Sequence, residues 1–201
     1  GSFVLDSNGN ILSIQQLALS VTDLPGYISN GNTPEGIYTI EGWYITPTEV
    51  IGPSPIILTR IPFEVSPQKF FHNQSIAKNW NLDLYRDFLP ESWRTYEPIF
   101  ESYYAGMFGR RLIIMHGSAD DPRYYIDQAF FPLTPSRGCI TSKEIWNHDN
   151  GTIVESDQIK LANAFFSTKV EKGYLIVINL NDKNTKVELS EILKFLPNVG
   201  K

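Results

Sequence analysis

Hydrophobic and polar positions alternate along the chain in short strand-like runs, and these runs are interrupted by one long stretch of helical pattern. Runs rich in β-branched and aromatic residues and bounded by Gly, Pro or Asn predict strands. They fall in the second half of 11–21 and at 37–40, 55–60, 112–115, 124–126 and 174–178. Apolar residues that recur every three or four positions predict helices. These fall at 76–89, 93–107, 156–166 and 189–196. The order predicts a β-dominated α+β domain.

The helical stretch at about 72–107 reads as an insertion between strands, with Ser75 as a possible first N-cap. It is rich in large aromatic residues, which serve either as its own core or as a wall that faces a substrate. Core packing is the favoured interpretation, because aromatic side chains mostly serve packing. The residues concerned are Trp80, Trp93, Phe100 and Tyr103. A later turn at 142–146 is interpreted as the start of a helical segment.

Length and composition fit a single domain over 1–201, with a short C-terminal extension at 181–201. The chain has 42% hydrophobic and 13% aromatic residues, enough for a sizeable core. A net charge of −5 and no dense Lys/Arg face argue against nucleic acid as a partner. No apolar run approaches the roughly 20 residues of a transmembrane helix. No export signal is visible in residues 1–20, and the oligomeric state is left open.

One cysteine, Cys139, is present in 201 residues, within a loop of small and polar residues at 133–141. It cannot form an internal disulfide, so it is either an inert thiol or a nucleophile. A nucleophilic thiol needs a nearby base, and His116 is the best candidate because it ends an apolar run and precedes Gly117. His72 and His148 lie in polar turns. No closely spaced ligand pair exists, so neither a metal site nor a cofactor is predicted.

The residues around Cys139 fit either interpretation, and a nucleophile is the favoured one. Gly138 leaves room for an acyl group, and backbone N–H groups there could face a developing oxyanion. Ser136 and Arg137 would form a polar, electropositive rim that favours a thiolate and could hold a substrate carboxylate.

Three segments, taken in order, resemble motifs of the L,D-transpeptidase catalytic domain, also called the YkuD-like domain. Residues 33–40 (Thr-Pro-Glu-Gly-Ile-Tyr-Thr-Ile) look like its Thr-Pro-x-Gly-x-aromatic-x-Ile segment. Residues 114–118 (Ile-Met-His-Gly-Ser) look like its histidine strand. Residues 136–140 (Ser-Arg-Gly-Cys-Ile) look like its nucleophile loop, and this third motif is specific when the other two precede it. The resemblance covers roughly 15–180, apart from the helical insertion.

The resemblance implies a YkuD-like mixed β-sheet or sandwich fold and a cysteine enzyme of the cell envelope, periplasmic or extracellular, that acts on peptidoglycan stem peptides. Cys139 would attack a peptide carbonyl and His116 would act as general base and then acid. The carbonyl of Gly117 would orient the imidazole. A thioester acyl-enzyme would pass to an amine, or to water in an L,D-carboxypeptidase or other murein peptide hydrolase. A catalytically silent peptidoglycan-binding module is the alternative from another class.

Two features depart from the family pattern. Many members have Arg two residues after the cysteine, where this chain has Thr141, so substrate anchoring is expected to involve Thr141 and Arg137 instead. The 23 positions from His116 to Cys139 exceed the usual spacing and are expected to reshape the cleft.

Overall fold

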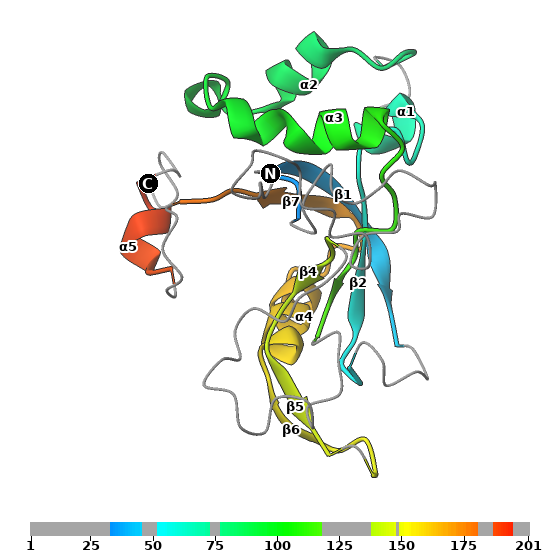
Figure 1. Cartoon of the computed structure of the whole chain (residues 1–201), viewed down its shortest axis with the longest axis vertical. Coiled ribbons are helices and arrows are strands. Elements are labelled where there is room, and N and C mark those ends of the chain that lie inside the picture. The colour runs from blue at the N-terminus through cyan, green and yellow to red at the C-terminus, as the bar shows by residue number, and fades with distance from the viewer. Residues whose placement is uncertain are drawn as a thin grey trace, which may run out of the picture.

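The structure, a computed structural model, combines a strongly curved mixed sheet with several helices (Figure 1). It describes residues 33–45, 52–72, 77–117, 138–147, 149–180 and 187–194. The described strands are β1 (Gly36–Tyr44), β2 (Ile56–Arg60), β3 (Met115–His116), β4 (Ile140–Thr141), β5 (Glu144–Trp146), β6 (Ile153–Ser156) and β7 (Gly173–Val177). The helices are α1 (Pro67–Phe70), α2 (Leu82–Phe88), η3 (Glu91–Trp93), η4 (Glu97–Phe100), α3 (Glu101–Met107), α4 (Asp157–Ser167) and α5 (Leu189–Ile192). This mixture of helices and sheet agrees with the predicted α+β class.

The five-stranded sheet has the order β4-β3-β2-β1-β7. β1 is antiparallel to both β2 and β7, β2 is antiparallel to β3, and β3 is parallel to β4. The strands predicted at 37–40, 55–60 and 174–178 are therefore confirmed. At 112–115 only the end of the predicted run is in the ladder, because β3 begins at Met115. The strands predicted within 11–21 and at 124–126 lie outside the described residues.

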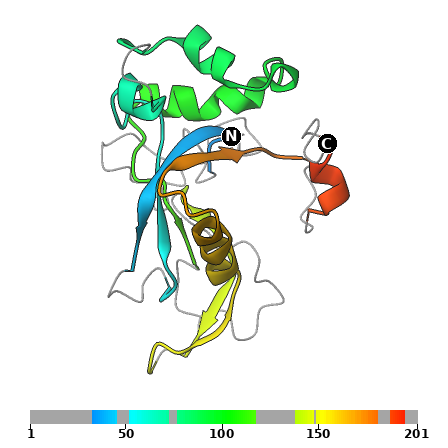
Figure 2. The ribbon, with the colours of Figure 1, turned by 180° about the vertical axis from the view of Figure 1, so that it is seen from behind.

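The helices α1, α2 and α3 lie together over one end of the sheet, above β1 and β7 (Figures 1 and 2). Aromatic side chains fill the space between them, and the buried ones include Phe70, Tyr85, Trp93, Phe100 and Tyr103. The packing interpretation of Trp93, Phe100 and Tyr103 is thus confirmed, and the partly buried Trp80 packs against the same cluster. Helix α2 begins later than predicted, with the Asn81 side chain accepting the Asp83 N–H at 2.7 Å. Ser75 lies outside the described residues.

Successive residues of β1 enter different core clusters, as strand alternation requires. Ile37 packs in the aromatic cluster of the helices, whereas Tyr38 packs in a second cluster with Ile61, Ala105 of α3 and Ile113. Ile140 of β4 and Leu175 of β7 also contact the Tyr38 cluster, although β4 and β7 are the two edge strands. The curvature of the sheet therefore brings the strand that follows Cys139 onto the central core.

A hairpin of β5 and β6 projects from the end of the sheet opposite the helices and leads into α4 (Figure 1). Ser156 caps α4 by accepting the Ile159 N–H at 2.9 Å, which confirms the predicted cap. The helical segment predicted at 142–146 is wrong. Glu144 and Trp146 are buried and Ile145 between them is only partly so, the period of two that a strand imposes.

The short helix α5 confirms part of the helix predicted at 189–196, and it stands apart from the other described helices (Figures 1 and 2). None of its residues is buried. Within the described ranges no helix is long and apolar enough to cross a membrane.

Candidate active site

The strand that ends in His116 and the strand that follows Cys139 are neighbours in the sheet. In the parallel β3–β4 pair, Met115 lies opposite Ile140 and His116 lies opposite Thr141. The Ser142 N–H donates to the His116 carbonyl at 3.1 Å, which extends this pairing. Cys139 comes directly before β4. The sheet therefore places the residues that follow Cys139 beside the strand that ends in His116, although Cys139 and His116 are 23 positions apart in the chain.

The first motif, at residues 33–40, also contacts the loop that carries Cys139. The Thr33 hydroxyl donates to the backbone carbonyl of Cys139 at 3.1 Å. Gly36, three residues later, has φ +135°, and a Cβ there would lie 2.6 Å from both the Tyr85 hydroxyl and the Ile99 carbonyl. Only glycine fits this close approach between β1 and the helices. The glycine of this motif thus serves packing, while its threonine contacts the nucleophile loop.

His116 is held in one orientation by the backbone next to it. The side chain is 3% exposed, and its Nδ1 lies 2.6 Å from the Gly117 carbonyl oxygen. A carbonyl only accepts, so Nδ1 carries the proton and Nε2 carries the lone pair. Burial lowers the pKa of His116, and the bond to Gly117 opposes that effect in part. A neutral imidazole with its lone pair on Nε2 can accept a proton at neutral pH.

The Cys139 thiol is half-buried and bonds to the main chain just before the histidine strand. It donates to the Leu112 carbonyl at 3.5 Å. Leu112 has φ +57°, a conformation that is an outlier for a bulky side chain and that clusters at functional sites. Burial raises the pKa of the thiol, while a hydrogen bond from the Ile114 backbone and the charge of Arg110 act in the opposite direction. The protonated thiol is therefore the resting form at neutral pH.

Arg110 supplies a positive charge near the thiol that the sequence did not single out. The residue follows α3, donates its N–H to the Ala105 carbonyl at 2.9 Å and is only 2% exposed. Desolvation lowers the pKa of its guanidinium, and interactions with Tyr38 and Cys139 act against this. A buried arginine in a doublet such as Arg110-Arg111 has no sequence signal that separates it from its exposed neighbour. Its charge stabilises the thiolate that forms when Cys139 loses its proton.

Glu144 is a second residue that the sequence did not single out. Its side chain is fully buried in β5, and its Oε1 accepts the Ser54 N–H at 2.9 Å. The carboxylate lies directly against Gly117, the residue that orients His116. Burial raises the pKa of this carboxyl, and hydrogen bonds with Ser54 and Ser156 partly offset the effect.

Some of the remaining predicted residues lie in the described part of the chain, and others lie outside it. Gly138 has φ +101°, a backbone conformation that favours glycine at the bend before β4. Thr141 lies opposite His116 in the ladder. Ser136, Arg137 and His148 lie outside the described residues. His72 follows α1 and lies against Tyr174 of β7, with ring centroids 4.7 Å apart and the ring planes tilted by 30°.

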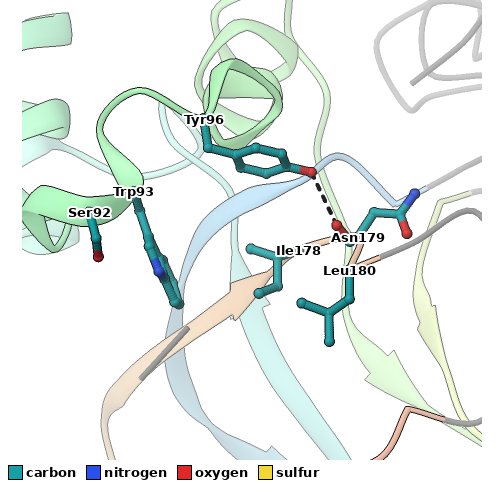
Figure 3. Close-up of a pocket in the computed structure, with 6 residues that line it drawn as sticks. All are labelled: Ser92, Trp93, Tyr96, Ile178, Asn179 and Leu180. Carbon is teal, nitrogen blue, oxygen red and sulfur yellow. Dashed lines mark hydrogen bonds between the residues drawn. The ribbon is translucent and has the colours of Figure 1, made fainter. Parts of the chain in front are cut away.

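A pocket of about 160 Å³ lies between η3 and the segment that follows β7 (Figure 3). It is lined mainly by apolar surface, and its residues are Ser92, Trp93, Tyr96, Ile178, Asn179 and Leu180. The Tyr96 hydroxyl donates to Glu35 Oε2 at 2.6 Å, and the Asn179 N–H donates to the same oxygen at 3.0 Å. Glu35 is two residues from Thr33, so the first motif connects this pocket with the Cys139 loop.

Within the described part of the chain, no group of three or more His, Cys, Asp or Glu residues is placed to hold a metal ion. Comparison of the chain with protein-family models, with curated proteins and with solved structures gives no match.

Proposed function

We propose that this protein is a cysteine acyl-transfer enzyme of the cell envelope that acts on peptidoglycan stem peptides. The observation that carries the proposal is the parallel pairing of the His116 strand with the strand that follows Cys139, with the imidazole held as the Nδ1–H tautomer. Such a pairing supplies a thiol, a neutral base and a carbonyl that orients the base. The peptide substrate and the YkuD-like fold are inferred from the three motifs that resemble L,D-transpeptidases.

The chemistry begins with both partners uncharged. The sulfur exchanges its bond to the Leu112 carbonyl for one to Nε2 of His116, and the thiol proton moves to Nε2 as sulfur bonds to the substrate carbonyl carbon. Backbone N–H groups near Gly138 and Cys139 face the developing oxyanion. His116 then returns the proton to the leaving amine as the C–N bond breaks, which leaves a thioester on Cys139.

The second half of the reaction reverses these roles. An incoming amine or water loses a proton to Nε2 of His116 as it attacks the thioester, and the C–S bond breaks. The departing sulfur takes up the proton that His116 holds. Arg110 lowers the cost of the thiolate at each stage.

The test incubates the purified chain with disaccharide tetrapeptide muropeptides and follows the products by mass spectrometry. Cross-linked dimers together with a thioester adduct on Cys139 support transpeptidation. Release of the terminal D-residue without dimers supports the L,D-carboxypeptidase alternative. Cys139→Ala is the control, and it should abolish both the adduct and the turnover.

Two results would overturn the enzymatic proposal. One is turnover by the Cys139→Ala chain equal to that of wild type. The other is the absence of product and of adduct from wild type with every muropeptide. Binding of intact muropeptides without an adduct would instead support the silent binding module.

A further inference from the structure

The segment that carries Cys139 also carries, five residues later, the buried carboxylate of Glu144. This segment follows the histidine strand closely. Ile140 and Ser142 donate backbone N–H groups to the carbonyls of Ile114 and His116, at 2.9 and 3.1 Å. Glu144 then starts β5, with its side chain inside the protein.

The Glu144 carboxylate occupies the space that a side chain at position 117 would take. A Cβ added to Gly117 would lie 2.8 Å from Glu144 Cδ and closer still to Oε2. Non-bonded carbon atoms do not approach to that distance without displacement. The carboxylate therefore supports the peptide unit whose carbonyl accepts the hydrogen bond from His116 Nδ1.

Neighbouring polar groups hold this carboxylate in place. Ser54 donates its backbone N–H to Oε1, and the Ser54 and Ser156 hydroxyls lie 3.0 Å from each other. Ser156 is in turn fixed as the N-cap of α4. Two residues further on, Gln158 donates to the Met115 carbonyl at 3.3 Å and accepts from the Ser142 hydroxyl at 2.7 Å. Groups from β5, from the start of α4 and from the loop before β2 therefore meet beside the backbone of residues 115–117.

We propose that Glu144 is a positioning residue for His116, which holds the Gly117 carbonyl against Nδ1 and thereby keeps Nε2 available for the thiol proton. This role rests on the proposed function for its catalytic meaning, but the orientation of the imidazole can be observed without any substrate. Buried supporting groups of this kind fix the geometry of reacting side chains, and small misplacements of those side chains lower turnover strongly.

The decisive measurement is ¹⁵N NMR of the imidazole in ¹⁵N-histidine-labelled protein, with the His116 signals assigned by His116→Gln. Wild type should show one tautomer, with the proton on Nδ1. Glu144→Ala should show a mixture of tautomers or a shift toward the Nε2–H form. Glu144→Gln has the same shape and keeps the acceptor for Ser54, so it should restore the wild-type signals. Glu155→Ala, which removes an exposed carboxylate of the same hairpin that pairs with Lys143, should have no effect.

Turnover of muropeptides gives the second readout. Glu144→Ala should lower kcat about tenfold or more with little change in KM, and Glu144→Gln should recover most of the rate. If Glu144→Ala does not fold, Glu144→Asp gives the same comparison, because it withdraws the carboxylate from Gly117 by one methylene.

The two proposals fail in different ways. An unchanged Nδ1–H tautomer in folded Glu144→Ala or Glu144→Asp would overturn the positioning role, whether or not wild type is active. A changed tautomer together with a wild-type chain inactive on every muropeptide would support the positioning role and overturn the proposed substrate class.

Discussion

Two buried polar clusters in this protein each press against a glycine, but they differ in chemistry. The first, which we call the tyrosine cluster, joins Tyr85 and Ser102 of the helices to β1 at Gly36. The second, the glutamate cluster, joins Glu144, Ser54 and Ser156 at Gly117. In both, a missing side chain allows a polar group to approach the backbone closely.

The tyrosine cluster is neutral and its hydrogen bonds are complete around one oxygen. The Tyr85 hydroxyl accepts the Ile37 N–H at 2.8 Å, donates to the Ile99 carbonyl at 2.9 Å and lies 2.9 Å from the Ser102 hydroxyl. Burial raises the pKa of Tyr85 to about 12, so this group does not ionise at ordinary pH. Such a cluster fixes the position of the helices on the sheet.

The glutamate cluster contains an ionisable group in an equally buried place. A buried carboxylate is costly unless its surroundings compensate for the lost water, and the raised pKa of Glu144 shows that the compensation is partial. The fold tolerates this cost beside the candidate histidine, whereas the tyrosine cluster uses neutral groups. A local cost of this kind is typical of functional sites.

The largest expected effect comes from adding a methyl group at each glycine. Gly36→Ala combines a φ of +135° with a clash against the Ile99 carbonyl, so it should lower the free energy of unfolding by about 3 kcal/mol or more. Gly117→Ala meets the side chain of Glu144 rather than backbone, and Gly117 has no positive φ, so this substitution should cost less. Urea unfolding followed by circular dichroism measures both.

Double variants sharpen this contrast. Glu144→Ala should relieve much of the Gly117→Ala penalty, because the clashing atoms are then absent. Ser102→Ala should relieve little of the Gly36→Ala penalty, because the Ile99 carbonyl is backbone. If the second substitution restored the same share of the lost free energy of unfolding in both pairs, the contacts described at Gly36 and Gly117 would be contradicted.

A smaller effect is expected from Tyr85→Phe. It leaves the shape intact but removes the oxygen that binds Ile37, Ile99 and Ser102, and should cost about 2 kcal/mol. The loss should be the same from pH 5 to pH 8, since no group of this cluster titrates there. Tyr104→Phe, at a 44% exposed position of α3, is the control and should be close to neutral. A loss that varied with pH would show that the tyrosine cluster is coupled to an ionisable group.

The sequence predicted the elements whose signals are local. The strands at 37–40 and 174–178 have continuous β-branched and aromatic runs, and the Ser156 cap is followed by a helical period, so short-range rules suffice. The segment at 142–146 failed for a physical reason. Its alternation spans only three residues, Glu144 to Trp146, and the inward residue at one end is a glutamate. A charged residue in that position is normally read as facing solvent.

The residues of the candidate site also separate into those that have a local sequence signal and those that have none. Cys139, His116 and Gly117 could be singled out because rare residue types next to glycine carry a chemical signal. Arg110 and Glu144 could not, because their significance lies in burial and in contacts between segments far apart in the chain. Arg110 and Arg111 are adjacent and identical in type, and only the fold buries one and exposes the other.

A moderate, pH-dependent effect is expected from Glu144→Gln. Because burial raises the pKa of Glu144 above its ordinary value of 4.5, the folded chain holds this proton more tightly than the unfolded chain. The resulting stability is fully present below about pH 4.5 and is lost as pH rises through the raised pKa. Glutamine does not titrate, so the stability of Glu144→Gln relative to wild type should increase with pH above about 4.5.

This difference is best measured by urea unfolding of both chains at half-unit steps of pH. The lowered pKa of His116 gives wild type an opposite slope below pH 6.5, but it is present in both chains and cancels in the comparison. A stability difference that stayed constant from pH 4 to pH 8 would mean that Glu144 has the same pKa folded and unfolded.

The smallest expected effect concerns the positive charge of Arg110 near the Cys139 thiol. Arg110 opposes the rise in the pKa of Cys139 that burial causes, so Arg110→Met should raise that pKa further. Since Cys139 is the only cysteine, alkylation by iodoacetamide reports on it alone, and labelling at pH 7 should slow about three- to tenfold. Arg111→Met is the matched control: its charge is exposed and screened by water and salt, so the labelling profile should stay close to wild type. Equal slowing by the two variants would show that the thiol senses the net charge of the surface rather than the buried guanidinium of Arg110.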